Sequence, residues 1–167
     1  MNNYKLIILD FDGTLCATHE AILYCVKRTY KTLNMTVPAH DFIDETIRAG
    51  LGMEKTLLAL SPELTEQQIQ PILDQYEKIY LSEGEQKSAP YSKAGEVLAK
   101  LHAAGYKLAV VSNKAVAAVN TALERFQLKQ YITAVVGDTK TLRKKPDPMA
   151  YTDFIQPKFK EIDPKQI

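Results

Sequence analysis

The sequence predicts an α/β fold in which a parallel sheet carries helices on both faces. Three features of the chain indicate this. The four-residue apolar run Leu6–Leu9 is typical of a buried strand in a parallel sheet. Residues 16 to about 86 show helical spacing only, and from Tyr91 onward short apolar strands alternate with helices. We therefore expect a core domain made of residues 1–15 and 87–167, with residues 16–86 inserted as a helical domain.

The composition is that of an ordinary soluble protein, with 46% apolar and 25% charged residues in a chain of 167. Lys and Arg number 21 and Asp and Glu number 20, a balance that argues against a surface for nucleic acid or membranes. No apolar run approaches the roughly 20 residues of a membrane helix. The two cysteines, Cys16 and Cys25, come without a signal-peptide pattern. We therefore expect a protein of the reducing cytoplasm.

Two carboxylates follow the first predicted strand directly, at Asp10 and Asp12. Residues two apart on an extended chain point the same way, so both address one spot beyond the strand end. In open parallel sheets, ligands bind beyond the carboxyl ends of the strands, where this spot lies. Gly13 permits a sharp turn and a close approach of the backbone to a ligand. Because two hard oxygen donors suit magnesium, we expect Mg²⁺ there.

The inserted segment is expected to form four helices. The first carries an apolar face through Leu33, and further helices are expected at about 41–48 and 53–60, separated by a break at 50–52. Thr65 and Gln68 have the spacing of a capping box before the last helix. An insertion directly after the carboxylate strand is expected to act as a lid that excludes water.

Two further polar groups follow later elements of the core. Ser112 comes directly after the predicted strand 108–111, at the same edge as Asp10. It suits either a phosphate-binding hydroxyl or the N-cap of the next helix. Lys145 lies after the strand 134–136 and before a helical stretch at about 149–155. Its ammonium suits phosphate oxygens and can hold Asp10 in place. Taken alone, Lys145 is more typical of a solvated surface lysine in the run 143–145.

These residue types match the requirements of phosphate-ester hydrolysis. Asp10 can attack phosphorus and form an aspartyl-phosphate. Asp12 can protonate the leaving oxygen and later take a proton from water. Ser112, the backbone N–H groups after it and Lys145 can donate to the phosphate oxygens. Cys16 lies nearby but has no basic neighbour in the sequence to activate it, so we expect a small buried side chain.

The run Asp-Phe-Asp-Gly-Thr-Leu at 10–15 resembles the first motif of the haloacid dehalogenase superfamily of phosphatases. Residues 110–114, Val-Val-Ser-Asn-Lys, resemble its second motif, whose hydroxyl binds phosphate. Residues 145–148, Lys-Pro-Asp-Pro, resemble the third, whose lysine does the same. Two longer stretches, residues 89–106 and 126–139, resemble the phosphoglycolate phosphatase-like branch of this superfamily.

The resemblance implies a three-layer, Rossmann-like core with a helical cap after the first strand. It implies a magnesium-dependent phosphatase of a small phosphorylated metabolite such as phosphoglycolate. The metal would be held by the Asp10 carboxylate and the Asp12 backbone carbonyl, with Asp10, Asp12, Ser112 and Lys145 as catalytic residues. Substrate-binding residues would be Gly13, Thr14 and Asn113 in the motifs, and Arg48 and Gly52 in the cap. For Arg48 and Gly52, a helix end followed by a turn is an equally good interpretation.

The family's fourth motif, a glycine and acidic residues after one more strand, has no match after Lys145. Gly137-Asp138-Thr139 precedes Lys145 and corresponds to the turn before the third motif. We therefore expect that the core domain is incomplete at its C-terminus. The chain would then be either a truncated form of a longer protein or a phosphatase that has lost part of its site. Its first strand would have an open edge that permits self-association. Magnesium binding would be weak and turnover low.

Two alternatives stay open. One is a phosphomutase or phosphonatase of the same superfamily, and a phosphonatase would need Lys55 to form a Schiff base. The other is a binding or interaction module without catalysis, which a missing fourth motif favours.

Overall fold

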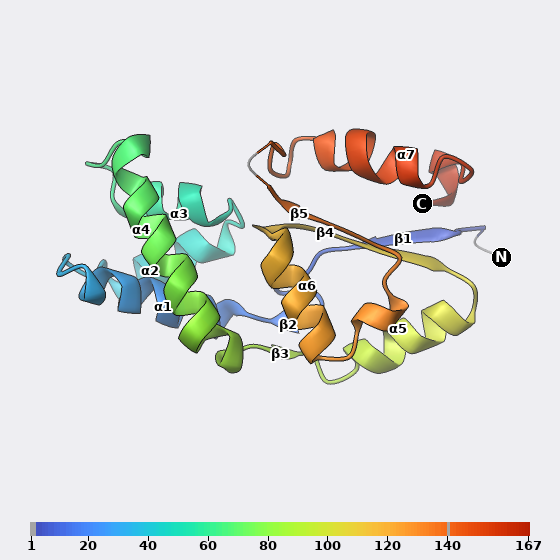
Figure 1. Ribbon diagram of the computed structural model, residues 1–167, viewed down its shortest axis with the longest axis horizontal. Helices are drawn as coiled ribbons and strands as arrows, with labels where there is room; N and C mark the ends of the chain where they lie inside the picture. Colours follow the sequence, from blue (N-terminus) through green and yellow to red (C-terminus); the bar gives the residue numbers. More distant parts are fainter. Residues whose placement is uncertain (1–2, 140) are drawn as a thin grey trace. The chain divides into compact units, whose positions relative to one another are not determined.

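A parallel sheet in the order β1-β4-β5 forms the centre of one unit of the computed structural model, which describes residues 3–139 and 141–167 (Figure 1). The strands are β1 (Leu6–Leu9), β4 (Lys107–Ala115) and β5 (Ala134–Asp138). This unit comprises Met1–Ala17 and Pro90–Ile167, and Thr18–Ala89 form a second unit. The sequence placed these boundaries at 15/16 and 86/87.

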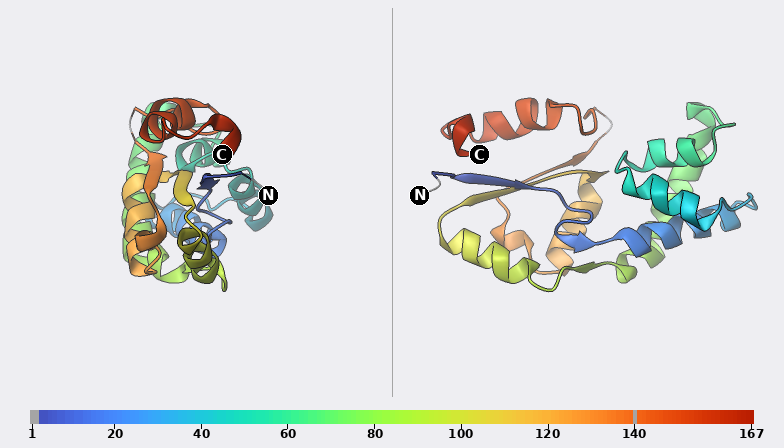
Figure 2. Two further views of the ribbon diagram at one scale, coloured as in Figure 1. Left: turned by 90° about the vertical axis from the view of Figure 1, so that its right-hand side faces the viewer. Right: turned by 180° about the vertical axis from the view of Figure 1, so that it is seen from behind.

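Helices cover both faces of the sheet (Figures 1 and 2). On one face lie α5 (Ala94–Ala103) and α6 (Val116–Arg125). On the other lie the π-helix η4 (Ala150–Ile155) and the short α7 (Gln156–Lys158), where the sequence predicted one α-helical stretch. The predicted α/β class with a helix–sheet–helix core is confirmed.

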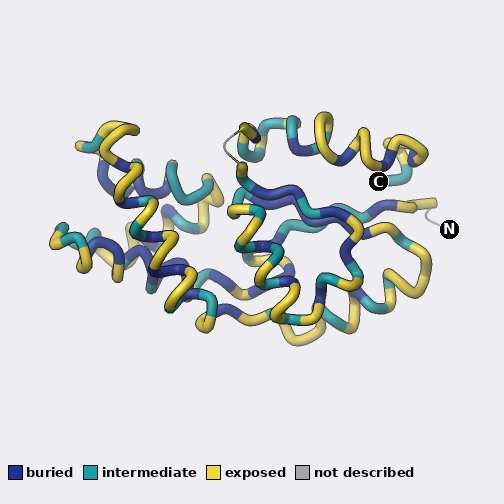
Figure 3. The backbone as a smooth tube through the Cα atoms, in the orientation of Figure 1, coloured by how far each residue is buried: buried dark blue, intermediate teal, exposed yellow. Residues whose placement is uncertain are grey.

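The central strand β4 contributes to both layers of the core. Leu108 and Val110 pack in the cluster that includes α6, whereas Ala109 and Val111 pack in the cluster that includes η4. This alternation follows from the two-residue period of a strand. The strands β4 and β5 are accordingly dark blue, or buried, along most of their length in Figure 3.

Strand β1 is an edge strand among the described residues, as expected from the missing fourth motif. Its side chains contact both faces of the core, Leu6 and Ile8 on one face and Ile7 and Leu9 on the other, but most of them are only partly buried. It pairs in parallel with β4, from Leu6 opposite Lys107 to Leu9 opposite Val110. Only Leu6 is fully buried, because no described strand covers the other side of β1. At its start, the Lys5 N–H donates to the Gln166 carbonyl at 2.8 Å, so the two ends of this unit lie side by side.

Strand β4 is longer than the apolar pattern indicates. The prediction ended the strand at Val111, but β4 continues to Ala115, which pairs with Asp138 after an irregularity in the register. The N-cap of α6 is Ala115, which has no side-chain cap, so the N-cap interpretation of Ser112 is wrong. The polar residues 112–114 are strand residues because β5 supplies a partner beyond the apolar run.

The second unit has four α-helices and its own core. The helices are α1 (His19–Thr32), α2 (His40–Arg48), α3 (Met53–Leu60) and α4 (Glu66–Ile79), followed by the π-helix η1 (Tyr80–Gly84) and the 3₁₀ turn η2 (Glu85–Lys87). Fully buried side chains from all four α-helices form the core, among them Val26, Ile43, Leu57 and Ile69. The predicted capping box of Thr65 and Gln68 is confirmed at the start of α4.

The remaining elements are short. β2 (Cys16–Ala17) and β3 (Ala89–Pro90) form a two-stranded sheet where the chain leaves and re-enters the first unit. The 3₁₀ turns η3 (Lys129–Tyr131) and η5 (Pro164–Gln166) lie in the first unit. Among the helices that the structure describes, none has the length and apolar character needed to cross a bilayer.

Candidate active site

Asp10 stands directly after β1, at the carboxyl end of the sheet. Its Oδ1 accepts a hydrogen bond from the Phe11 backbone N–H at 2.8 Å and one from the Lys145 ammonium at 2.9 Å. Both of these bonds fall on the same oxygen. They orient the carboxylate while its side chain stays 41% exposed, and a nucleophile has to be both oriented and accessible.

Lys145 is brought to Asp10 from 135 residues away by the loop after β5. Its ammonium also donates to the Val111 carbonyl at 3.0 Å, at the end of the apolar part of β4. The loop is fixed by Asn113, whose side-chain oxygen accepts from the Lys145 N–H at 2.7 Å and whose amide donates to the Lys145 carbonyl at 3.2 Å. The Lys145–Pro146 peptide bond is cis. The Asn113 side chain therefore holds Lys145 in place, and the substrate contact expected of Asn113 stays a prediction.

Asp12 has a different lysine as its partner. The Lys114 ammonium lies 3.4 Å from Asp12 Oδ1, and the Lys114 side chain is only 10% exposed. Sequence reasoning missed Lys114 as a site residue, although the second motif contains it. Because the sequence predicted that this strand ends at Val111, its pattern gave no signal for Lys114 beyond its place in the motif.

Ser112 and the turn after Asp12 have well-defined backbone bonds. Ser112 is 3% exposed, and its Oγ accepts from the Lys114 N–H at 3.2 Å. Gly13 has φ +75, the conformation that glycine tolerates best, and its N–H donates to the Cys16 carbonyl at 2.9 Å. The Thr14 N–H donates to the Phe11 carbonyl at 3.3 Å. The turn is therefore held by its own backbone bonds, and both Gly13 and Thr14 are exposed.

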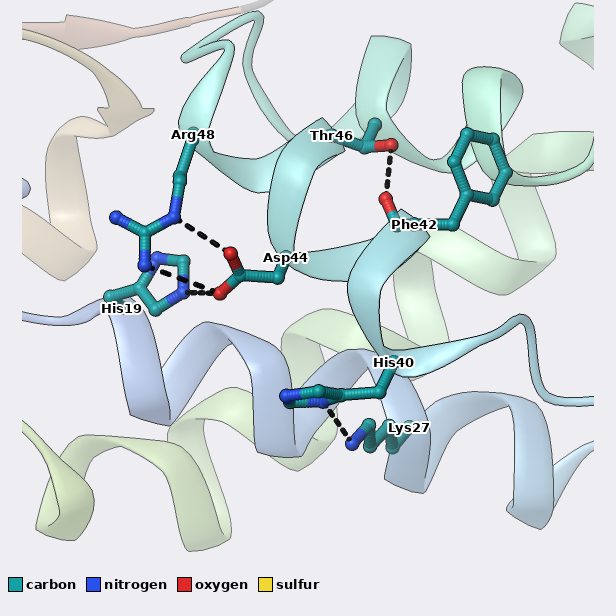
Figure 4. A network of polar contacts seen from close by, with 7 residues as sticks. All are labelled: His19, Lys27, His40, Phe42, Asp44, Thr46 and Arg48. Carbon is teal, nitrogen blue, oxygen red and sulfur yellow. Dashed lines mark hydrogen bonds and ion pairs between the residues drawn. The ribbon is translucent and has the colours of Figure 1, made fainter.

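The predicted residues Arg48 and Gly52 lie in the second unit. Arg48 ends α2, and its Nε donates to Asp44 Oδ2 at 2.7 Å, while His19 Nε2 lies 2.6 Å from Asp44 Oδ1 (Figure 4). The hydrogen bond from Arg48, followed by that from His19, lowers the pKa of Asp44 from its ordinary 3.8 to about 2. Gly52 precedes α3 with φ +84. Lys55 is exposed on α3, whereas Schiff-base lysines are usually desolvated.

The oxygens at the end of β1 suit a cation held by the Asp10 carboxylate and the Asp12 backbone carbonyl. Among the described residues, both hydrogen bonds to Asp10 fall on Oδ1, so Oδ2 of this 41% exposed side chain is open to a cation, whereas Asp12 Oδ1 faces the Lys114 ammonium at 3.4 Å. Among the described residues, no group of three or more His, Cys, Asp or Glu gathers as a metal site. Magnesium is commonly held by one or two carboxylates together with substrate phosphates and water. Asp10 and Asp12 fit that minimal arrangement.

Cys16 is unsuited to nucleophilic chemistry. The side chain is fully buried, and burial followed by the nearby Asp12 carboxylate raises the pKa of its thiol to about 12. A thiol with this pKa stays protonated near neutrality.

The family profile described as haloacid dehalogenase-like hydrolase matches residues 7–166. A phosphoglycolate phosphatase from Psychrobacter arcticus is 31% identical over 154 residues, which cover 86% of this chain and 65% of the relative. The phosphoglycolate phosphatase of Vibrio cholerae is 26% identical, with 90% and 69% covered. The chain thus spans about two thirds of the length of these relatives.

Solved structures show the same fold. The crystal structure of a predicted phosphoglycolate phosphatase from Haemophilus somnus matches with a TM-score of 0.84 at 26% identity, covering 100% of this chain and 76% of that one. A haloacid dehalogenase-like hydrolase from Bacteroides fragilis matches with a TM-score of 0.83 at 18% identity, covering 94% and 73%. At that identity the second likeness concerns the fold alone.

Proposed function

Because this chain belongs to the haloacid dehalogenase-like hydrolase family, we propose that it hydrolyses a small phosphate monoester through an aspartyl-phosphate on Asp10. One observation carries the proposal. Asp10, at the end of a parallel strand, is held by the Lys145 ammonium at 2.9 Å, although 135 residues separate the two. A nucleophile and a cation thus meet beyond the carboxyl ends of the parallel strands, where ligands bind in such sheets.

The reaction proceeds in two displacements. In the first, an Asp10 carboxylate oxygen bonds to phosphorus as the bond to the ester oxygen breaks, and Asp12 delivers a proton to that leaving oxygen. In the second, water attacks the same phosphorus while Asp12 takes up its proton, and the bond to Asp10 breaks. Inorganic phosphate and the free alcohol are the products, and both aspartates return to their starting states.

Lys145 supplies positive charge for the phosphoryl oxygens and holds Asp10 at the angle of attack. Ser112 Oγ and the backbone after it lie at the same end of β4 and complete the set of donors. We also propose Mg²⁺ as the cofactor, held by Asp10 and Asp12. When bound, it would neutralise phosphate charge and orient the phosphoryl group.

We propose phosphoglycolate or a similarly small monoester as the substrate, since the curated relatives carry that name. We propose that Arg48 contacts the carboxylate of such a substrate. Cys16 and Cys25 are buried and are not joined in a disulfide, which supports a reducing, cytoplasmic location.

We further propose that Mg²⁺ binding and turnover by this chain are weak, because no third acidic or histidine ligand gathers in the described part of the site. The same observation favours a second candidate function, a module that binds phosphate without hydrolysing it. In that case phosphate and Mg²⁺ would bind, and no phosphoenzyme would form.

The test has to work at low turnover. The chain is mixed with Mg²⁺ and a ³²P-labelled phosphate monoester, quenched in acid, and assayed for protein-bound label that hydroxylamine releases, as expected of an acyl phosphate. We expect label on the wild type and none on Asp10→Asn. Lys100→Met, at a solvent-exposed ion pair with Glu96 on α5, serves as the matched control and should label like the wild type. Label on Asp10→Asn, or none on a folded wild type that binds phosphate, contradicts the aspartyl-phosphate mechanism.

A further inference from the structure

We propose that Lys114 is a positioning residue that holds the Asp12 carboxylate in one orientation. The proposal rests on the proposed function for its effect on rate, since Asp12 transfers protons only in that reaction. The geometry that carries it is independent of the function. A lysine side chain that is 10% exposed places its ammonium 3.4 Å from a buried carboxylate oxygen.

Hydrogen bonds fix the backbone around Asp12, so only the rotamer of the Asp12 side chain can still vary. The backbones of Asp12 and Cys16 pair in an isolated β-bridge, and the Gly13 N–H donates to the Cys16 carbonyl at 2.9 Å. The N–H groups of Leu15 and Cys16 both converge on the Phe11 carbonyl, at 3.0 and 3.1 Å. By contrast, Asp12 Oδ1 accepts no hydrogen bond from a described residue. An ion pair is therefore what can hold this oxygen in place.

Lys114 is itself held at the end of β4. Its N–H donates to Ser112 Oγ at 3.2 Å. Its carbonyl lies so close to Gly137 of β5 that a Cβ on Gly137 would stand 2.8 Å away. Because the Lys114 side chain is only 10% exposed, much of its rotamer freedom is already lost, so little further entropy is lost when its ammonium pairs with a carboxylate.

The neighbouring lysines Lys144 and Lys145 have different acidic partners. Lys145 binds Asp10 at 2.9 Å and the Val111 carbonyl at 3.0 Å. Lys144 pairs with Asp138 at 3.0 Å and is 15% exposed. Three partly buried lysines thus pair with three different carboxylates, and the one on Asp12 is Lys114.

The direct test is the Asp12 rotamer in solution. Three-bond NMR couplings from the Asp12 backbone N and C′ to its Cγ report whether the side chain occupies one χ1 rotamer or averages over several. We expect a single rotamer in the wild type and in Lys114→Arg, and averaged couplings in Lys114→Met. Lys144→Met is the matched control, since it removes a similarly buried ammonium from another carboxylate, and Asp12 should keep its single rotamer. If Lys114→Met does not fold, Lys114→Gln replaces it with the same expectation.

The kinetic test separates positioning from substrate binding. Lys114→Met should lower kcat for an alkyl phosphate by about 10²-fold, the cost of a misplaced group, with KM nearly unchanged. The loss should be smaller for an aryl phosphate, whose leaving group needs little protonation, and Lys114→Arg should recover much of it. A rise in KM for both substrates at unchanged kcat would instead identify Lys114 as a phosphate ligand.

The two proposals fail in different measurements. A folded wild type that gives no phosphoenzyme contradicts the proposed function and leaves the NMR result to decide the role of Lys114. Unchanged Asp12 couplings in Lys114→Met, or equal averaging in Lys144→Met, contradict the positioning role even in an active phosphatase.

Discussion

At the scale of single residues, the site depends on which lysine pairs with which acid. The run Arg143-Lys144-Lys145 presents three adjacent cations. Lys145 pairs with Asp10, Lys144 with Asp138, and Arg143 with Asp147. The three adjacent residues therefore pair with three different acids, and within this run Lys145 is the residue that pairs with Asp10, the proposed nucleophile.

Replacement of Lys145 by Met tests that selectivity. The change removes a cation from the phosphoryl oxygens and leaves Asp10 without its ion pair, so phosphoenzyme formation should slow by roughly 10²–10³-fold. Single-turnover labelling of this variant beside Lys144→Met gives the measurement. Equal slowing in both variants would mean that the loop, rather than the Lys145 ammonium, determines the rate.

Asp44 predicts a pH dependence of stability. Its pKa is lowered to about 2 in the folded chain, by the hydrogen bond from Arg48 and then that from His19. A lowered folded pKa means that the unfolded state binds the proton first. This contribution to stability is therefore present above about pH 4 and is lost as the pH falls toward 2.

Urea unfolding of the wild type and Asp44→Asn between pH 6 and pH 2 measures this contribution. The wild type should be the more stable protein at pH 6, and the difference should shrink as the pH falls. Glu45→Gln, an exposed acid on the same helix, provides the baseline. A difference between wild type and Asp44→Asn that grows toward low pH would contradict the assigned ion pair.

At the scale of elements, the end of β4 is shaped by its contact with β5. A Cβ on Gly137 would lie 2.7 Å from Val116 Cα and 2.8 Å from both the Lys114 carbonyl and the Val116 nitrogen. All three are backbone atoms, which cannot move aside as a flexible side chain can. Glycine at 137 therefore lets β5 approach the segment that carries Ser112 and Lys114.

Gly137→Ala should lower the free energy of unfolding by about 1–3 kcal/mol, the usual cost of overpacking. Gly95→Ala in α5 is the matched control, since its Cβ would meet only Leu128 Cδ2 at an ordinary 3.5 Å. That variant should be neutral or slightly stabilising, because alanine favours helix. Thermal unfolding of both variants gives the comparison, and equal losses would refute the steric argument.

At the scale of the whole molecule, each unit has its own apolar core, and the first unit has a strand edge without a described partner. The core of the second unit comes from its helices alone, and two clusters cover the faces of the sheet in the first. Beyond β1, the described sheet has no further strand. An edge with unpaired backbone groups and partly exposed apolar side chains is a template for another chain.

Self-association through β1 is therefore expected to rise with concentration in sedimentation velocity. Tyr4→Lys should reduce it, because Tyr4 is 48% exposed just before β1 and a lysine there opposes edge pairing. Phe42→Lys replaces a similarly exposed aromatic residue of the second unit and should leave association unchanged. A monomer at all concentrations, or an equal effect of both variants, would exclude β1 as the interface.

Local patterns in the sequence were sufficient for much of this protein. The apolar run before Asp10, the capping box at Thr65 and the alternation of strands and helices after Tyr91 each depend on neighbouring residues, so the α/β class and most elements could be predicted. The order of the three motifs also indicated that Asp10, Ser112 and Lys145 follow strands or loops at one edge of a parallel sheet.

Only the tertiary structure decided the partners and the ends of the elements. β4 extends to Ala115 because β5 pairs with it there, and Lys114 becomes a site residue for the same reason. The choice of Lys145 over Lys144 for Asp10 depends on a loop that Asn113 fixes from 32 residues away. Such pairings depend on distances between segments remote in the chain, and a linear pattern of residues contains no measure of those distances.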